Sequence, residues 1–333
     1  MVPPWWLAQG GPACLGMVLR KRKRKGVVAL LSGLALLFLA ACGAAATPTP
    51  LPVTATPIPP TATPVPRPAN PQILLASTTS TRDSGLMDVL MPIFEMQTGY
   101  QVKPSYIGTG AAMTMGQQGN ADVLLVHAPA SEVKFMQDGY GSVRKLVMHN
   151  DFIIVGPPSD PAGIRNMTSA VDALKKLQAA QATFYSRGDN SGTDQLEKSL
   201  WAKAELTVKD GAATNPSWYH EANVGMGQLL LVASEKTGYT MTDRATYLAN
   251  KQNLSLDILA EGDAALLNIY HVIQVDQDKH PNLKINVEGA KAFADFMVSP
   301  AAQQIIARFG VDKYGQPLFF PDADKTEAQL GSQ

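Results

Sequence analysis

The chain has 333 residues, with 28 Lys and Arg against 28 Asp and Glu, so its formal net charge is zero. Residues 1–41 carry six of the basic residues and no acidic one, which leaves 22 basic against 28 acidic residues, or −6, in the remainder. A balance of this kind excludes nucleic-acid binding through bulk positive charge. The two cysteines, Cys14 and Cys42, form no CxxC motif and are too few for a disulfide framework.

Residues 1–41 have the pattern of a secretory signal peptide. Arg20 to Lys25 is an unbroken basic run, and residues 27–41 are almost wholly apolar. The run ends in Leu-Ala-Ala-Cys42, which resembles the bacterial lipobox and predicts lipidation of Cys42 as the first mature residue. A membrane helix is the weaker alternative, because about 15 apolar residues fall short of the ~20 needed to span a bilayer. Met17 is an alternative start to Met1.

Residues 42–70 are predicted to be an extended tether. They are rich in Thr, Pro and Ala, and Arg67 is their only charged residue. Such a composition cannot bury a core. With a lipid on Cys42, the tether would hold the folded body near the outer surface of a membrane.

Residues 71–325 alternate short apolar runs with helical patterns, which predicts a mainly parallel α/β sheet. Ligands of such sheets gather at the carboxyl ends of the strands. The predicted strands are 73–76, 101–107, 123–126, 152–155, 183–186 and 269–275. The predicted helices are 86–98, 111–117, 132–138, 170–178, 194–204, 226–236, 244–250 and 289–309.

Five consecutive hydroxyl residues, Ser77 to Thr81, lie between the first predicted strand and the helix 86–98. Amide groups at a helix start have no intrahelical partner, and the helix dipole makes that end attractive to an anion. Hydroxyls add donors without adding charge. The alternative is a simple N-cap, but one hydroxyl is enough for that.

Three later junctions repeat this chemistry. Gly108-Thr109-Gly110 precedes a helix, and its glycines would let backbone approach a ligand closely. The segment from Arg187 to Thr193 adds a permanently charged fork of donors within a Gly/Ser turn. Residues 221–228 precede an apolar helix. Plain turns are the alternative at the first and third of these junctions, and a solvated surface arginine at the second.

In this order the motifs resemble the tungstate-binding solute receptors of bacterial ABC importers. The resemblance covers roughly residues 73–310. One departure is Asp194, where this pattern would place a His. The motifs that carry it are Ser77–Thr81 with Ser84-Gly85-Leu86, Gly108–Gly110, Ala121–Pro129, Asn150–Pro157, Ser186–Thr193 and Tyr239–Arg244.

The resemblance implies a two-lobe type II periplasmic-binding-protein fold, α/β in class, with two hinge crossings near residues 152–155 and 267–270. Lobe one would comprise residues 71–153 and 268–325, and lobe two residues 154–267. The protein would be a lipid-anchored extracytoplasmic receptor, not an enzyme, that binds tungstate without a cofactor and delivers it to an ABC permease. The implied ligand-binding residues are Thr78, Thr79, Ser80, Thr81, Thr109, Arg187, Ser191, Gly192 and Thr193.

A tetrahedral dianion such as tungstate offers only acceptors near pH 7, so its site should present donors and no carboxylate. Asp189 and Asp194 are therefore predicted to point away from the ligand, capping the helix or orienting Arg187. Singly protonated phosphate, by contrast, would accept a nearby carboxylate. Molybdate, which has nearly the same size and charge, cannot be separated from tungstate by sequence, and phosphate and sulfate also stay open.

Two functions of other classes remain as alternatives. A lipid-anchored hydrolase would use Ser80 or Ser84 as nucleophile, but the chain has no Gly-x-Ser-x-Gly elbow and no nearby His in sequence. A sensory module would need a second domain. The five histidines have no metal-ligand spacing, so no metal site is expected. His127 is expected to be a structural, hydrogen-bonded residue.

Overall fold

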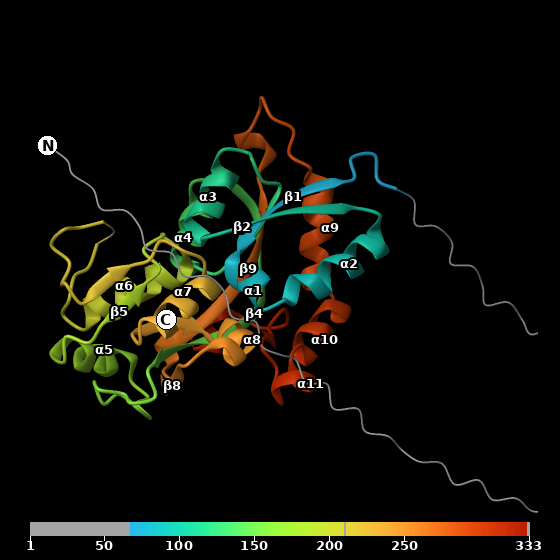
Figure 1. Cartoon of the computed structure of the whole chain (residues 1–333). Coiled ribbons are helices and arrows are strands. Elements are labelled where there is room, and N and C mark those ends of the chain that lie inside the picture. Colours follow the sequence, from blue (N-terminus) through green and yellow to red (C-terminus); the bar gives the residue numbers. More distant parts are fainter. Residues whose placement is uncertain (1–66, 210, 332–333) are drawn as a thin grey trace, which may run out of the picture. The chain divides into compact units, whose positions relative to one another are not determined.

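A computed structural model describes residues 67–209 and 211–331 (Figure 1). The predicted signal peptide, most of the tether and Cys42 lie outside the described residues. The described strands are β1 Gln72–Thr78, β2 Gln101–Ile107, β3 Val123–Val126, β4 Gly141–Gly156, β5 Phe184–Ser186, β6 Tyr219–Glu221, β7 Tyr239–Asp243, β8 Asp257–Ala260, β9 Leu267–Val275 and β10 Phe320–Pro321. The described helices are α1 Thr79–Asp83, α2 Leu86–Thr98, α3 Thr109–Gln117, α4 Pro129–Gln137, α5 Ala170–Ala179, α6 Gly192–Lys203, α7 Met226–Glu235, α8 Arg244–Asn250, α9 Val287–Met297, α10 Pro300–Arg308 and α11 Val311–Tyr314.

The strands form one sheet in the order β2-β1-β3-β9-β4-β7-β5-β6, and β8 and β10 also pair with β4. Strand β4 belongs to two parts of this sheet. As far as Asp151 it pairs with β9, and from Phe152 onward it pairs with β7 and β8. We call β2, β1, β3, β9 and the first part of β4 the first region, and the remainder of β4 with β7, β5, β6 and β8 the second region.

The chain passes between the two regions twice, once within β4 and once where β8 leads to β9. The two crossings lie near residues 152 and 267, at the positions that the resemblance implied. The ranges proposed for the two lobes follow the same division, but their exact boundaries remain a prediction.

Each region has its own apolar core. In the first region α2 and α9 lie side by side (Figure 1). Phe94 of α2 meets Phe293 of α9 edge-on, with ring centroids 5.3 Å apart. In the second region Phe184 of β5 meets Trp201 of α6 edge-on at 5.2 Å. Buried aromatic rings contribute much of the hydrophobic stabilisation of a core, so each region is stabilised by its own set of apolar contacts.

The structure corrects two expectations. The sheet is mixed rather than mainly parallel, because β4 and β9 run antiparallel to each other and to their other neighbours. The helix predicted over residues 289–309 is two helices. Ser299 caps α10 by accepting a hydrogen bond from the amide of Ala302, and Pro300 occupies the first turn, so the chain breaks there and starts again.

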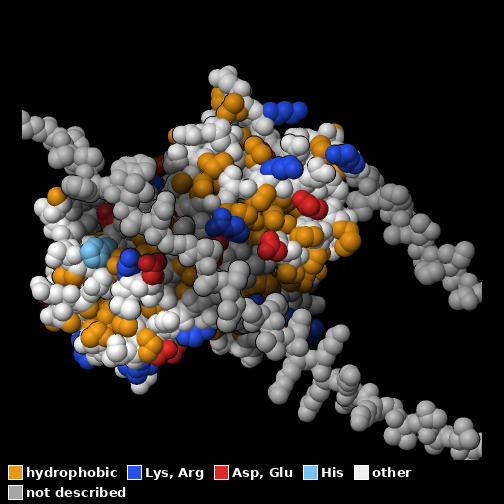
Figure 2. Space-filling model, in the orientation of Figure 1, with side chains coloured by type: hydrophobic (Ala, Val, Ile, Leu, Met, Phe, Trp, Pro, Cys, Tyr) orange, Lys and Arg blue, Asp and Glu red, His pale blue; other side chains and the backbone are white. Residues whose placement is uncertain are grey.

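On the face shown in Figure 2, Lys and Arg side chains are interspersed with Asp and Glu, and neither sign forms a continuous area. This distribution agrees with the balanced composition. Among residues 67–209 and 211–331, no helix has both the length and the apolarity that crossing a bilayer requires.

The buried carboxyl of Glu197 lies in the core of the second region, and its titration can be measured. Its carboxyl is fully buried, and Oε1 accepts hydrogen bonds from Tyr219 Oη at 2.8 Å and Trp201 Nε1 at 3.2 Å. Burial raises the pKa of Glu197 to about 8, well above its ordinary value of 4.5. Between these values the folded protein binds a proton that the unfolded chain releases, so the free energy of unfolding should fall as the pH rises.

We expect Glu197→Gln to flatten the fall in unfolding free energy between about pH 5 and pH 8, because an amide keeps the acceptor oxygen and cannot titrate. Urea unfolding across that range measures the slope. Glu205→Gln, at an exposed position of the same region, is the control and should keep the wild-type slope. A Glu197→Gln variant with that same slope would contradict the assignment.

Candidate functional site

The four junctions singled out in the sequence meet where the two regions face each other. The amide of Gly110, at the β2–α3 junction, donates to the carbonyl oxygen of Asn190 at 3.1 Å, in the loop before α6. The amide of Met226, at the start of α7, donates to Thr79 Oγ1 of α1 at 3.1 Å. These two bonds join the first region to the second and enclose the residues between them.

Glycines make this approach possible. A Cβ at Gly110 would lie 2.3 Å from Asn190 Nδ2, and one at Gly192 would lie 2.4 Å from the carbonyl oxygen of His127. A Cβ at Gly108 would lie 3.2 Å from the Cα of Ser191. The backbones of the two regions therefore come closer than any side chain would permit.

The hydroxyl run divides into separate roles. Ser77 and Thr78 end β1, and Thr79 begins the one-turn helix α1. Ser77 Oγ donates to the carbonyl oxygen of Leu125 at 3.0 Å, and Thr81 Oγ1 donates to the carbonyl oxygen of Thr78 at 2.8 Å. The hydroxyls of Ser77 and Thr81 therefore secure the junction itself.

Thr78 and Ser80 are the two members whose side-chain oxygens bond to no main-chain group in the described residues. Their oxygens lie 3.0 Å apart, and both side chains are buried. Thr79 differs, because its oxygen accepts the Met226 amide across the interface. Because these two oxygens share one hydrogen bond, one of their two hydroxyl hydrogens is left to donate to a ligand.

Arg187 follows β5 and is only 3% exposed. Its Nη2 bonds to Asp189 Oδ2 at 2.5 Å, whereas its buried Nε has no hydrogen-bond partner among the described residues. Leaving a buried donor unpaired costs about 1–3 kcal/mol, and more for a charged group. An acceptor placed between the two regions would remove that cost.

Asp189 and Asp194 are the two carboxylates whose presence suggested phosphate as an alternative ligand. Both accept hydrogen bonds from amides of their own loop. Asp189 Oδ1 accepts the amide of Ser191 at 3.1 Å, so this side chain orients Arg187, as predicted. Asp194 accepts the amides of Gly188 and Asn190, each at 3.1 Å. That neither carboxylate faces an anion remains a prediction.

The remaining predicted residues line the starts of two helices. Thr109 is the first residue of α3, and its buried Oγ1 has no partner in the described part of the chain. Ser191 caps α6 by accepting the amide of Asp194 at 3.2 Å, which leaves its own hydrogen free to donate. Gly192 and Thr193 open α6, so their amides have no intrahelical partner.

His127 follows β3 and touches this site. Its Nδ1 is buried without a partner among the described residues, and its ring lies 4.7 Å from that of Tyr270. Burial, and then the charge of Arg187, lowers the pKa of His127 to about 4, so the ring is neutral at pH 7. The ring hydrogen-bonds to the side chain of Asn268, in keeping with the expected structural role.

The PBP superfamily domain model matches residues 64–301. The tungstate-binding protein TupA of Peptoclostridium acidaminophilum is 47% identical over 255 residues, which cover 76% of this chain and 86% of that protein. The chain belongs to the TupA family of the PBP superfamily. The resemblance carried by the sequence motifs is thereby confirmed.

Two solved structures are also similar to this TupA-family chain. The tungstate ABC transporter structure from Geobacter sulfurreducens is 41% identical, with a TM-score of 0.63, and the match covers 72% of this chain and 98% of that one. The tungstate-binding protein TupA from Desulfovibrio alaskensis G20 is 43% identical, with a TM-score of 0.61, and covers 76% and 99%.

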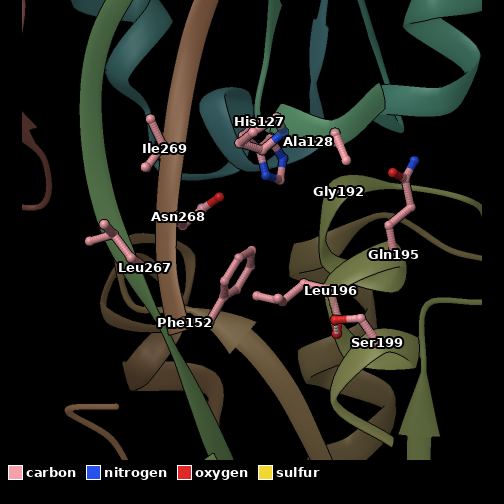
Figure 3. Close-up of a pocket in the computed structure, with 12 residues that line it drawn as sticks. His127, Ala128, Phe152, Gly192, Gln195, Leu196, Ser199, Leu267, Asn268 and Ile269 are labelled. Carbon is pink, nitrogen blue, oxygen red and sulfur yellow. Dashed lines mark hydrogen bonds between the residues drawn. The ribbon is translucent and has the colours of Figure 1, made fainter. Parts of the chain in front are cut away.

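A separate cavity of about 210 Å³ lies beside the crossing strands of the TupA-family fold (Figure 3). Figure 3 shows His127, Phe152 and Leu196 around it, with Asn268 on the β9 side. The cavity shares Gly192 with the predicted ligand-binding residues but is lined by none of their hydroxyls. It is mostly apolar, and so we do not assign the anion to it.

No group of three or more His, Cys, Asp or Glu residues within residues 67–209 and 211–331 has the arrangement of a metal site. Tyr270 and Asn268, which border the site from β9, were not singled out in the sequence. They lie in an apolar strand pattern, and the pairing of β9 with β3 and β4 brings them to the junctions.

We expect Gly192→Ala to weaken the contact between the regions, because the added methyl would meet the carbonyl oxygen of His127. Hydrogen exchange at the Gly110 amide, which bonds across the interface, should become faster. Ser199→Ala, on the same helix α6, is the control, since that hydroxyl donates within the helix to the carbonyl oxygen of Leu196. Unchanged protection in Gly192→Ala would contradict the role of this glycine.

Proposed function

We propose that this protein is an extracytoplasmic receptor that binds tungstate between its two regions and delivers it to an ABC permease. The relatives that support this proposal are named tungstate-binding proteins and a tungstate ABC transporter. They are binding proteins of transport systems, and the present chain is likewise a receptor rather than an enzyme. Its ligand needs no cofactor.

The observation that carries the proposal is the enclosed set of unpaired donors. Arg187 Nε and Thr109 Oγ1 are both buried without partners among the described residues. The hydroxyls of Thr78 and Ser80 belong to the β1–α1 junction, and the amides that open α6 follow the loop that Gly110 contacts. We place both sets of donors around one ligand. A fully deprotonated tetrahedral oxyanion offers several acceptors and would satisfy these donors together.

The electrostatic support for such an anion is spread over several groups. Asp189 compensates the charge of Arg187, so the site has little net charge of its own. The partial positive charge at the starts of α3 and α6, together with neutral hydroxyl donors, would then stabilise the dianion. Neutral donors around a buried oxyanion favour a ligand without a proton.

We assign the two lobes to residues 71–153 with 268–325 and to residues 154–267. The interface bonds at Gly110 and Met226 would form when these lobes close over the anion. The proposed contacts are those that the resemblance implied: Thr78, Thr79, Ser80, Thr81, Thr109, Arg187, Ser191, Gly192 and Thr193. Among them, the hydrogen bonds described above favour Thr78, Ser80, Thr109, Arg187 and the α6 amides.

The hydrolase alternative finds no support in the bonds of its candidate serines. Ser80 Oγ lies near Thr78 and Tyr270, and Ser84 Oγ donates to the carbonyl oxygen of Thr81. Neither serine has a histidine partner in the described residues, as a base-activated nucleophile requires.

We expect Arg187→Ala to weaken tungstate binding at least tenfold, because a hydrogen bond to a charged group contributes about 1.5–3 kcal/mol. Isothermal titration calorimetry measures the dissociation constant. Arg165→Ala removes an exposed arginine of the second region that pairs with Asp257, and this control should bind as the wild type does. An unchanged constant in Arg187→Ala would remove this residue from the site.

The identity of the anion has its own test. Protein purified in the presence of tungstate, molybdate and phosphate together should retain tungsten or molybdenum on elemental analysis, and competition calorimetry separates those two. Retention of phosphate alone would replace the proposal with a phosphate receptor.

We further propose that the chain is anchored by a lipid on Cys42, which the tether of residues 42–70 links to the folded body. Cys42→Ser should move the protein from the membrane fraction to the soluble fraction of the producing cells, because the thiol is the acylated group. Cys14→Ser is the matched control and should leave the protein on the membrane. Equal membrane association of both variants would refute the anchor.

A further inference from the structure

A continuous row of buried polar side chains runs from the hydroxyl cluster to the second region. It comprises Ser80 of α1, Tyr270 and Asn268 of β9, Asn150 of β4 and Asp243, which caps α8. Each of these side chains is at most 2% exposed. Five buried polar groups in contact cost stability unless their hydrogen bonds are satisfied, so the order of donors and acceptors along the row is constrained.

The contacts along the row are all within hydrogen-bond distance. Ser80 Oγ lies 3.1 Å from Tyr270 Oη, and Asn268 Nδ2 lies 3.1 Å from the same oxygen. Asn268 Nδ2 also lies 2.7 Å from Asn150 Oδ1. Asn150 Nδ2 completes the row at 3.2 Å from Asp243 Oδ1.

The direction of these bonds is fixed at the Asp243 end. Asp243 Oδ1 accepts hydrogen bonds from the amide of Thr246 at 2.8 Å and from Asn150 Nδ2 at 3.2 Å. Asn150 must therefore turn its NH₂ group towards Asp243 and its oxygen towards Asn268. Asn268 in turn must present its own NH₂ group, one hydrogen to Asn150 and the other to Tyr270.

The direction of these hydrogen bonds also determines which group donates at the proposed anion site. Since Tyr270 Oη accepts from Asn268, the phenol hydrogen is left for Ser80 Oγ, the other partner of that oxygen in the described residues. Ser80 then accepts from Tyr270 and cannot donate back to it. When Thr78 Oγ1, 3.0 Å away, donates the second hydrogen bond, both lone pairs of Ser80 are used and its own hydrogen is left for a ligand. The leftover oxygen of Asn268 turns towards His127 (Figure 3).

We propose that Tyr270, Asn268, Asn150 and Asp243 are positioning residues that orient the Ser80 hydroxyl as a donor and thereby favour oxyanions that carry no proton. This inference rests on the proposed function and extends it to selectivity. Tungstate offers only acceptors and gains from an obligate donor. Hydrogen phosphate carries a proton, and a hydroxyl that is free to rotate could accept it, whereas one held as a donor cannot.

Tyr270→Phe tests the proposal, because it removes the phenol hydrogen that fixes Ser80 and changes the volume little. We expect tungstate binding to weaken by roughly two- to tenfold, the range of one neutral hydrogen bond. Affinity for inorganic phosphate, measured by displacement at neutral pH, should stay constant or increase. The ratio of the two affinities is a quantity that general destabilisation would not change.

Tyr247→Phe is the matched control. This tyrosine is also buried, and its hydroxyl donates to the carbonyl oxygen of Leu256, away from the junctions. It should lose similar thermal stability without ligand and keep the wild-type affinity ratio. Ser80→Ala completes a double-mutant cycle, in which Tyr270→Phe should have little further effect on tungstate binding once Ser80 is gone.

The outcomes distinguish a failure of the positioning role from a failure of the proposed function. Equal losses for both anions in Tyr270→Phe, an unchanged tungstate affinity, or additive losses in the cycle would each overturn the positioning role. Failure of the wild-type protein to bind tungstate would instead overturn the proposed function. If Tyr270→Phe does not fold, the same measurements on Asn268→Leu, which removes the donor to Tyr270, decide the matter.

Discussion

The site depends on a buried guanidinium that its own fold does not fully satisfy. Arg187 is almost inaccessible, and Asp189 balances its charge through one side of the fork, while Nε stays unpaired in the described structure. Burial of such a group requires compensation, which the proposed anion would supply as an acceptor. The contacts at Gly110 and Gly192 bring the opposing junctions close together.

The crossing strands connect this chemistry to the rest of the fold. β4 pairs with β9 up to Asp151 and with the second region from Phe152, so one strand belongs to both halves of the sheet. The buried row through Asn150 and Asn268 lies on these same strands. A movement that separates the regions would bend the strands at the place where the polar row crosses them. Position of the regions and orientation of the Ser80 donor are therefore linked by geometry.

Much of the local structure could be predicted from the sequence. The helix at residues 86–98 and the strands at 101–107 and 123–126 were predicted with their observed bounds, because their apolar spacing is regular. The first part of β4 was missed, since Arg144, Lys145 and His149 interrupt the pattern. Arg144 and Lys145 form ion pairs with Glu132 and Asp295, and His149 Nδ1 lies 2.6 Å from Asp322 Oδ2. Only the folded chain supplies these partners. β6 and β7 were missed because they are short and gain their identity from pairing with β5.

The sequence by itself determined which chemical groups are available: a hydroxyl run, two glycine-rich junctions and one arginine, each placed at a strand end by local periodicity. It also determined family membership through the order of these motifs. Tertiary structure decided which partner each of these groups bonds to. Thr81 and Thr78 are three residues apart, yet the hydroxyl of Thr81 bonds to the main chain and that of Thr78 bonds to Ser80 Oγ. Tyr270 joins the site from nearly two hundred residues away. Hydrogen-bond direction depends on which partners meet in space, and no local spacing contains that information.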